Sequence, residues 1–342
     1  MKYECGVLLK ALDSVKDIAK SIRIREKTAC VMLAHNQIIA QNDECYIAFS
    51  FDHNIEMAVL PFDKLYNLIS YFPASTKVAM SKKDGKVVIK LKGKTKSSQS
   101  TIAEIQDEDI AYIDPPLDGW DDLPDDFETG LKLCRFCLPK ESLNPALTTF
   151  GIDGDTIYTS DDFRISKYKM SDSFDRSFTI SGDNGGIIIA NNFLRYMLED
   201  TYIDLRKGDV FARIMLGIDE YPKIAEDLFS YDEKVTVAKS SFLTALDRAS
   251  LFAEGLSEID YAMEFFIKDN SYTFKAQNEF GKNTENGTLK GSISKDLSVN
   301  PVYLSQALKN LSSKKCDIGI DENNRLIFAE KGFSHILATY NK

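Results

Sequence analysis

One pattern recurs three times along this chain of 342 residues: a helix, a set of strands, a second helix and further strands. The first helix of each set is predicted to start near residues 7, 127 and 241, and the second near residues 61, 191 and 300. Similarity at a regular spacing indicates a repeat architecture, in which each unit has the same supersecondary structure. The sequence therefore predicts an α+β protein of three similar units.

The helices are predicted from apolar residues that recur every three or four positions. The first helix carries such a stripe at Leu8, Leu12, Val15, Ala19 and Ile22. Pro61 is expected in the first turn of a helix that continues to Phe72, because proline is tolerated there. The remaining helices are predicted at about 126–138, 191–200, 240–252 and 300–311. An Asp84-Gly85 pair between two β-like runs predicts a hairpin, whereas Ser181–Gly186 is interpreted as a turn.

Two acidic stretches without periodicity, Asp118–Asp126 and Ala225–Lys234, are interpreted as linkers. They place the domain boundaries at 1–118, 119–232 and 233–342. The net charge is −10, and residues 119–232 hold all of the excess, with 12 Lys and Arg against 22 Asp and Glu. The other two thirds are neutral, so an acidic total does not exclude nucleic acid, because the local field decides binding.

The chain is predicted to be cytoplasmic, with no membrane partner. Its longest apolar run, Ala29–Ala34, is far shorter than the roughly 18 residues that a membrane helix requires. The first residues, Met1–Cys5, lack a cleavage signal. Six cysteines in a chain of this length do not form a disulfide scaffold, which favours a reducing compartment.

The sequence gives little support for catalysis, and we predict no enzyme activity, metal or cofactor. The three histidines, His35, His53 and His335, are each interpreted as strand residues without a second ligand at metal spacing. Cys134 and Cys137 form a CxxC on an apolar helix stripe, which favours core cysteines over metal or redox use. The alternative is a metal-dependent phosphoryl-transfer enzyme that uses the Asp pairs at 121–122, 125–126 and 161–162.

Basic residues gather in two settings. A lysine-rich hairpin spans Lys82–Lys96, and its lysines alternate with Val88, Ile89 and Leu91. We interpret these lysines as guards of an exposed strand edge, with a nucleic-acid patch as the alternative. Other bases lie off the apolar stripes of the helices in all three units, which favours a surface that faces DNA over ordinary solvated helix faces. These predicted DNA-facing residues are Lys16, Lys20, Arg23, Lys132, Arg135, Arg248 and Lys309.

Three segments resemble the bacterial-type sliding clamp, the β subunit of the replicative DNA polymerase. Phe242–Phe252 is similar to the helix that opens the third domain of that family, and Val299–Leu304 with Ala307-Leu308 is similar to the start of its last helix. Gly154–Ile165 is similar to a strand and loop of its middle domain. The order of these segments and the three-unit layout extend the resemblance over the whole chain.

The resemblance implies three clamp domains, each with two helices packed on two small antiparallel sheets. Two such chains would close head-to-tail into a homodimeric ring around double-stranded DNA, without reading its sequence. The implied function is to tether a DNA polymerase for processive replication, with a clamp loader as a further partner. A trimeric ring with two units per chain is disfavoured by the count of three units.

The resemblance also implies a pocket between the second and third domains that receives a short peptide of the polymerase. The residues carried over to this pocket are Ser160, Asp162, Phe163, Arg164, Ile165, Pro222, Ile224, Leu337, Ala338, Thr339 and Tyr340. Arg164 has an alternative structural role, in a pair with Asp161 or a neighbouring strand carbonyl, and Phe163 and Tyr340 have the alternative of being domain-interface residues. The family pattern has Gly-His at Asp162-Phe163 and Met-Pro-Met at Ala338–Tyr340. These departures suggest a specialised peptide preference, as in the clamp of a phage or mobile element that supplies its own polymerase.

Overall fold

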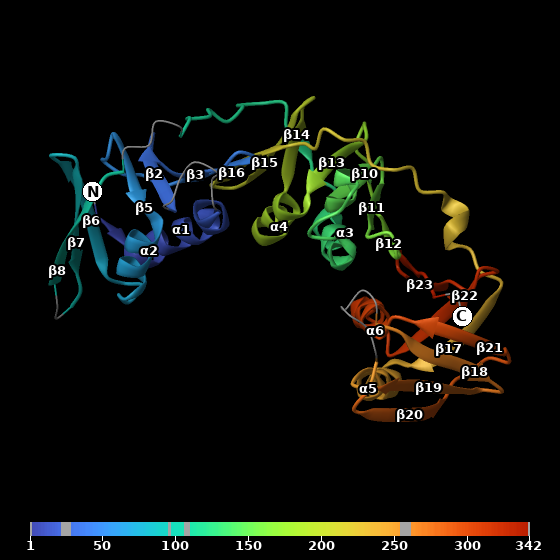
Figure 1. Ribbon diagram of the computed structural model, residues 1–342. Helices are drawn as coiled ribbons and strands as arrows, with labels where there is room; N and C mark the ends of the chain where they lie inside the picture. Colours follow the sequence, from blue (N-terminus) through green and yellow to red (C-terminus); the bar gives the residue numbers. More distant parts are fainter. Residues whose placement is uncertain (1, 22–28, 95–96, 106–109, 254–260, 341–342) are drawn as a thin grey trace. The chain divides into compact units, whose positions relative to one another are not determined.

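The computed structural model describes the chain except residues 1, 22–28, 95–96, 106–109, 254–260 and 341–342 (Figure 1). Within the described residues one order of elements occurs three times: a strand, a helix, four strands, a second helix and three strands. The three sets begin at β1 (Tyr3–Glu4), β9 (Asp121–Asp122) and β17 (Glu233–Ala238). The α+β class and the threefold repeat predicted from the sequence are confirmed.

The α-helices of the described residues are α1 (Cys5–Lys20), α2 (Phe62–Ser70), α3 (Phe127–Cys134), α4 (Gly182–Asn191), α5 (Lys239–Ser250) and α6 (Pro301–Asn310). The stripe predicted for α1 is buried at Leu8, Leu12, Val15 and Ala19, while Ile22 lies outside the described residues. The start of α6 is fixed by Asn300, whose side-chain oxygen accepts the N–H groups of Val302 (3.0 Å) and Tyr303 (3.1 Å).

One helix was predicted in the wrong place. Of the glycine-rich Ser181–Gly186, interpreted as a turn, Ser181 ends β13 and the residues from Gly182 onward form the start of α4. The helix predicted at about 191–200 is instead the strand β14 (Arg195–Leu198). Ile187 and Ile188 are buried on α4. Packing of this apolar segment outweighs the low helix propensity of its glycines, because tertiary context overrides intrinsic propensity.

Smaller corrections concern the element ends. Pro61 precedes the first turn of α2 as its N-cap, and α3 stops at Cys134, where a 3-10 turn (Arg135–Cys137) follows. The segments interpreted as linkers contain β9 and a 3-10 turn at Glu226–Phe229. His35 has a φ of 50° and lies in the turn after β2, and His53 also lies outside a strand.

The strands of the first repeat are β2 (Cys30–Ala34), β3 (Gln37–Gln41), β4 (Cys45–Ser50), β5 (Met57–Pro61), β6 (Lys77–Lys83), β7 (Lys86–Lys92) and β8 (Ser97–Ala103). Those of the second are β10 (Thr149–Asp153), β11 (Thr156–Ser160), β12 (Arg164–Lys169), β13 (Phe178–Ser181), β14, β15 (Tyr202–Lys207) and β16 (Val210–Met215). Those of the third are β18 (Met263–Lys268), β19 (Ser271–Asn278), β20 (Gly281–Thr288), β21 (Lys295–Val299), β22 (Lys315–Ile320), β23 (Leu326–Glu330) and β24 (Phe333–Leu337).

The small sheets of consecutive repeats join into larger ones. One eight-stranded sheet has the order β5-β2-β3-β4-β16-β15-β14-β9, and the other has the order β13-β10-β11-β12-β24-β23-β22-β17. The junction strands are β4 with β16 and β12 with β24, both antiparallel. The first and last small sheets, β1-β6-β7-β8 and β20-β19-β18-β21, remain four-stranded, so β8 and β20 are edges.

Because two of the sheets cross repeat boundaries, the chain divides into two compact units that differ from the three repeats. Unit 1 is residues 1–125 with 183–216, and unit 2 is residues 126–182 with 217–342. The domain boundaries at 118 and 232 therefore remain a prediction. In unit 1, Leu8 and Leu12 of α1 and Phe62 of α2 are fully buried, and each such side chain stabilises the core by about 1.5–3 kcal/mol.

No helix among the described residues is long and apolar enough to cross a lipid bilayer.

Candidate functional site

The predicted peptide site centres on the junction of β12 and β24 in unit 2. The register places Arg164 opposite Leu337, Ile165 opposite Ile336, and Ser166 opposite His335. Beyond the last pair the chains stay together, because the N–H of Ala338 donates to the carbonyl of Phe163 (2.9 Å). The loop before β12 and the C-terminal strand are therefore brought together, as the resemblance implies.

A tight turn delivers Phe163 to this junction. Asp162 has a φ of 70°, a left-handed conformation that Asp tolerates better than most residues. The Asp161 carboxylate accepts the N–H groups of Phe163 (3.2 Å) and Arg164 (3.0 Å), which fixes the turn. The Ser160 hydroxyl donates to the Arg164 carbonyl (2.9 Å) and is buried, so it serves the turn as well.

Arg164 is buried and fully engaged. Its guanidinium forms an ion pair with Asp161 (2.6 Å) and donates to the carbonyl of Phe136 (3.1 Å) and to the side chain of Gln306. It also stacks on the ring of Tyr303, 3.8 Å from the ring centre. With 6% of its surface exposed, Arg164 has the structural arrangement that the pair with Asp161 predicted.

His335 lies beside this network, with none of its surface exposed. Its Nδ1 lies 2.9 Å from the Ser166 hydroxyl, and its Nε2 has no hydrogen-bond partner among the described residues. Burial lowers the pKa of His335 to about 3, and the positive charge of Arg164 adds to the effect. The imidazole is therefore neutral at physiological pH and packs against the ring of Phe136, whose centre is 4.9 Å away.

The remaining predicted pocket residues differ in what they offer a peptide. Phe163 is 38% exposed, and its ring centre lies 6.4 Å from that of Tyr303. Leu337 is fully buried, so a peptide reaches it only if the junction rearranges. Partly exposed positions complete the set: Ile165, Ala338, Thr339 and Tyr340, with Asp162 exposed.

Pro222 and Ile224, both half-buried, belong to a segment that covers the other face of the same sheet. The ring of Tyr221 packs directly over Gly151, where a Cβ would fall 2.2 Å from a ring carbon. Farther along, Glu226 accepts a hydrogen bond from Tyr158 (2.8 Å) and pairs with Lys167. Tyr221 and Glu226, which flank Pro222 and Ile224 in sequence, thus contact the face opposite to the helix side on which Arg164 and Leu337 lie.

Three residues that the sequence did not single out complete the cluster around Arg164. Phe136 follows α3, and Tyr303 and Gln306 lie one turn apart on α6. Burial raises the pKa of Tyr303 to about 12, with Asp161 contributing, so its hydroxyl stays protonated. The sequence signal for Tyr303 was its place after the Asn300-Pro301 helix start, but nothing in that pattern indicated a contact with Arg164.

Of the predicted DNA-facing residues that the structure describes, five lie on α-helices, and four of these five are paired with acids. Lys20 pairs with Asp63 (3.3 Å), Arg248 with Glu285 (2.6 Å), Lys309 with Asp247 (3.9 Å) and Lys132 with Glu128. Lys16 lies over the ring of Tyr66, and Arg135 is exposed in the 3-10 turn. Arg23 lies outside the described residues. Exposed pairs of this kind are weak, so a phosphate can replace the carboxylate at small cost.

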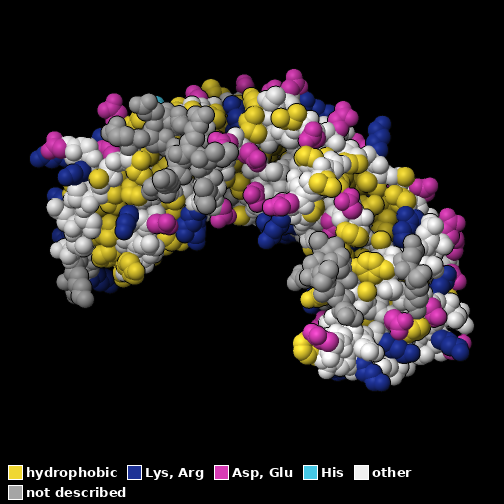
Figure 2. All heavy atoms as spheres, viewed as in Figure 1, with side chains coloured by type: hydrophobic (Ala, Val, Ile, Leu, Met, Phe, Trp, Pro, Cys, Tyr) yellow, Lys and Arg dark blue, Asp and Glu magenta, His cyan; other side chains and the backbone are white. Residues whose placement is uncertain are grey.

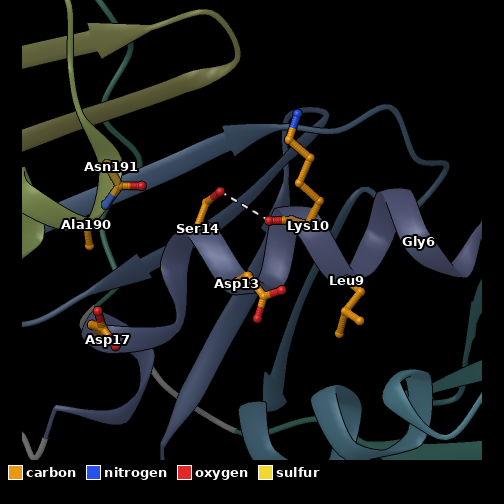
Figure 3. A pocket seen from close by; sticks show the side chains of 8 residues that line it. All are labelled: Gly6, Leu9, Lys10, Asp13, Ser14, Asp17, Ala190 and Asn191. Carbon is orange, nitrogen blue, oxygen red and sulfur yellow. Dashed lines mark hydrogen bonds between the residues drawn. The ribbon is translucent and has the colours of Figure 1, made fainter. Parts of the chain in front are cut away.

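A shallow cavity of about 340 Å³ adds acids to the same helix surface in unit 1 (Figure 3). Asp13, Ser14 and Asp17 line it from α1, and Ala190 and Asn191 line it from α4. Asp13 also accepts the hydroxyl of Tyr66 (2.7 Å). This part of the helix surface therefore carries both signs of charge, which weakens its attraction for phosphates.

Several of the residues considered for catalysis are buried or have structural partners. Cys134 and Cys137 are fully buried, and burial raises the pKa of Cys137 to about 12, as expected of core cysteines. Among the Asp pairs, Asp161 is bound to Arg164, and Asp126 accepts the Tyr168 hydroxyl (3.1 Å) and the Ser171 hydroxyl (2.9 Å). The described residues contain no group of three His, Cys, Asp or Glu side chains that could hold a metal ion.

Comparison with known proteins shows which solved structures share this fold. No protein-family model matches the chain, and no curated protein matches it in sequence. The threefold order of elements, with sheets that continue between repeats, is the fold of the bacterial sliding clamps. The DNA polymerase III subunit beta from Pseudomonas aeruginosa has a TM-score of 0.84 with this chain at 11% identity, over all of both chains.

Two further solved structures are similar over all of this chain and 99% of their own. The DNA polymerase III beta chain from Streptococcus pneumoniae has a TM-score of 0.84 at 17% identity. The sliding clamp from Bartonella birtlesii, solved with griselimycin bound, has a TM-score of 0.86 at 15% identity. The fold thus agrees from end to end, while the sequences have diverged widely.

Proposed function

We propose that the protein is a DNA sliding clamp, which encircles duplex DNA and tethers a DNA polymerase for processive replication. The observation that carries the proposal is the full-length agreement of the threefold fold with solved sliding clamps. A clamp holds DNA by topology, so it needs no contact with base edges. The weakly paired cations on α1, α3, α5 and α6 suit transient, salt-sensitive phosphate contacts that permit sliding.

In this proposal the chain is not an enzyme, acts in the cytoplasm, and its three domains follow the repeats at 1–118, 119–232 and 233–342. The alternative, a metal-dependent phosphoryl-transfer enzyme, needs free carboxylates at the Asp pairs. Asp161 and Asp126 are instead occupied by Arg164, Tyr168 and Ser171. The geometry therefore favours a role in binding over a role in catalysis.

The ring would close through the two edges that the internal junctions leave unused. Within each repeat, β4, β12 and β20 hold the same place, as do β16, β24 and β8. Since β4 pairs with β16 and β12 pairs with β24, β20 of one copy is expected to pair with β8 of another. Two copies joined at both ends make a closed homodimer, because a head-to-tail contact ends when the rotation closes.

The internal junctions also predict the register of this contact. By position in the repeat, Ser166 of β12 corresponds to Glu285 of β20, and His335 of β24 corresponds to Ser100 of β8. Because Ser166 pairs with His335, we expect Glu285 to lie opposite Ser100, and Thr284 to lie opposite Thr101. Cysteines at Thr101 and Thr284 should therefore crosslink two copies, because directly opposite residues have Cβ atoms about 5 Å apart. Cysteines at Thr101 and Asn283 are the matched control, since a shift of one residue places them on opposite faces. Equal crosslinking of both pairs, or none, would contradict the joint.

The polymerase, and by the same surface a clamp loader, would bind at the β12–β24 junction. A short peptide binds tightly only if apolar anchors enter a formed site and polar groups hold its backbone. Phe163 supplies an exposed apolar surface beside Tyr303, and the half-buried Ile165 lies next to it in sequence. Asp162, Thr339 and Tyr340 supply polar groups near the surface.

The topological claim has a direct test. The protein, with the loader and ATP of a bacterial replication system, should be retained on nicked circular DNA and should slide off after the circle is cut. Equal retention on circular and linear DNA would contradict a clamp. Light scattering should give the mass of two 38.5 kDa chains. A nuclease assay with Mg²⁺ tests the enzyme alternative on the same preparation.

A further inference from the structure

The outer face of the first four-stranded sheet carries a dense set of lysines. On β6 and β7 the alternate residues Val78, Met80, Val87, Ile89 and Leu91 are buried against the helices. The side chains between them point to the other face, because residues alternate along a strand. The exposed lysines of that face are Lys77, Lys83, Lys86, Lys90 and Lys92, and dark blue side chains lie along the side of the molecule where β6–β8 run (Figure 2).

For the lysines of β7 the interpretation as edge guards is wrong, whereas β6 is paired with β1 only at Lys77 and Val78 and is otherwise open on that side within the described residues. The sheet order is β1-β6-β7-β8, so β7 has a neighbour on each side. The edge strand β8 contains no lysine in Ser97–Ala103. A guard belongs on the edge, where it prevents pairing with another chain. Another reason is needed for Lys86, Lys90 and Lys92 on the inner strand β7.

The arrangement costs stability. Lys83 lies directly opposite Lys86, and Lys77 lies directly opposite Lys92. Like charges in opposite positions of an antiparallel pair are destabilising. Glu4 on β1 relieves Lys77 through an ion pair of 2.7 Å, but the ion pairs found among the described residues include none of Lys83, Lys86, Lys90 and Lys92. The acid closest in sequence, Asp84, is in the exposed hairpin turn.

The corresponding face at the other end of the chain differs. On the sheet β20-β19-β18-β21, Lys275 lies opposite Glu264, and Asp296 shares the face with Lys268 and Lys282. That surface mixes both charges, as an ordinary solvated face does. Four of the helix cations are also paired with acids: Lys20, Lys132, Arg248 and Lys309. The four lysines on β6 and β7 thus share one surface and form no ion pair within the described residues.

We propose that this face binds the phosphate backbone of single-stranded nucleic acid on the outside of the protein. Among its described residues this face of β6 and β7 has no aromatic anchor, since the residues between the lysines are Ala79, Ser81 and Val88. A protein partner usually needs such anchors, whereas a polyphosphate binds through charge alone. The lysines extend over about 20 Å of strand. A flexible single strand can follow a twisted sheet for that distance, while a duplex is stiff over about 150 base pairs and touches it along a short line.

The interaction is weak, strongly salt-dependent and indifferent to sequence. Without aromatic residues the bases have nothing to stack on, so phosphate contacts supply the affinity. Four contacts to a single strand correspond to a slope of about −3 in a plot of log affinity against log salt, at about −0.7 per contact. This function is separate from the encircling of duplex DNA, because a strand bound to an outer face needs no closed ring.

The test compares two variants that each remove four positive charges. The first carries Lys83→Gln, Lys86→Gln, Lys90→Gln and Lys92→Gln. The control carries Lys140→Gln, Lys290→Gln, Lys314→Gln and Lys331→Gln, four exposed lysines that lie outside the named helices and strands. Binding of fluorescent dT20, a 20-base-pair duplex and a poly-glutamate peptide is measured between 50 and 200 mM salt by anisotropy.

We expect the first variant to lose about tenfold or more in dT20 affinity at 50 mM salt, together with most of the slope, while the control keeps both. Its melting temperature should be equal or higher, because the like-charge pairs are gone. Equal dT20 binding by the two variants overturns the proposal, as does a preference of the wild type for the duplex or the acidic peptide. Retention of the first variant on nicked circles separates this outcome from failure of the clamp function.

Discussion

The two sheet junctions inside the chain share one backbone arrangement but use different side chains. The β4–β16 junction presents apolar residues on its helix side: Cys45, Ile47 and Phe49 opposite Ile214, Ala212 and Val210. The β12–β24 junction presents Arg164, Ser166 and Tyr168 opposite Leu337, His335 and Phe333. Since the first junction forms without a charged group on this side, the fold does not require the buried arginine and histidine of the second. We infer that they serve the surface beside them.

The loops at the two junctions support this inference. The N–H of Met215 donates to the carbonyl of Glu44 at the first junction (2.8 Å), as the N–H of Ala338 donates to that of Phe163 at the second (2.9 Å). Glu44 thus holds the place of Phe163, and its carboxylate accepts a hydrogen bond from Asn184 (3.1 Å). At the first junction the side chain of Glu44 is hydrogen-bonded to Asn184 of the same unit. At the second junction the ring of Phe163 is exposed and lies beside the ring of Tyr303.

The largest expected difference between the junctions is their response to acid. His335 has a pKa of about 3 when folded, against about 6.5 when unfolded, and Ala212 at the matching position does not titrate. Above pH 6.5 both states are neutral. As the pH falls from 6.5 to 3 only the unfolded state gains the proton, so the free energy of unfolding should drop by about 4–5 kcal/mol.

Urea unfolding of the wild type and of His335→Leu, measured at half-unit steps from pH 7.5 to 3.5, isolates this contribution. The difference between the two stability curves should widen as the pH falls, because other groups titrate equally in both proteins. His35→Leu, at an exposed turn, is the control. Curves for wild type and His335→Leu that stay parallel would show that the buried imidazole is not what makes this junction sensitive to acid.

The next largest effect should come from Arg164→Met. It leaves the buried Asp161 carboxylate without its cation, and breaking a buried ion pair costs about 3–5 kcal/mol. Cys45→Ala, at the matching place in the apolar junction, should cost only about 1 kcal/mol. Chemical denaturation of both variants checks the contrast.

A second substitution sharpens this comparison. Asp161→Asn in the Arg164→Met background removes the unpaired charge, so most of the lost stability should return if charge is the cause. A double variant as unstable as the single one would show instead that Arg164 acts by packing against Tyr303 and Phe136. A single variant that loses less than 1 kcal/mol would remove the distinction between the two junctions.

The sequence predicted those parts of the fold that local patterns determine. The stripe of α1 and the Asn300-Pro301 start of α6 are local, because one short segment supplies both the cap and the buried face. The α4 helix failed for the opposite reason. The glycines of this segment are typical of a turn. The segment is buried through contacts with residues far away in sequence, such as the hydrogen bond between Asn184 and Glu44, which a local pattern does not contain.

The candidate site was predictable only in part for a similar reason. The resemblance brought the Ser160–Ile165 loop and the C-terminal strand together, and the structure pairs them. It did not show which side chains remain open. Arg164 meets Gln306 across 142 positions of sequence, and Leu337 is fully covered by its neighbours. Burial of this kind depends on packing between distant segments, which a single sequence does not encode locally.

The smallest effect on stability, and the sharpest on function, is expected from Phe163→Ala. The ring is 38% exposed, so its removal should change the free energy of unfolding by less than about 1 kcal/mol. Affinity for a polymerase tail peptide should fall by about 1–3 kcal/mol, or roughly 5- to 150-fold, if the ring is an anchor. Titration calorimetry measures this, with Glu44→Ala at the first junction as the matched control. Leu337→Ala is a poor test, because truncating a fully buried leucine costs about 2–5 kcal/mol of stability by itself. Unchanged peptide affinity in Phe163→Ala, or an equal loss in Glu44→Ala, would mean that the exposed aromatic ring does not mark the binding junction, and the contrast between the two junctions would then concern stability alone.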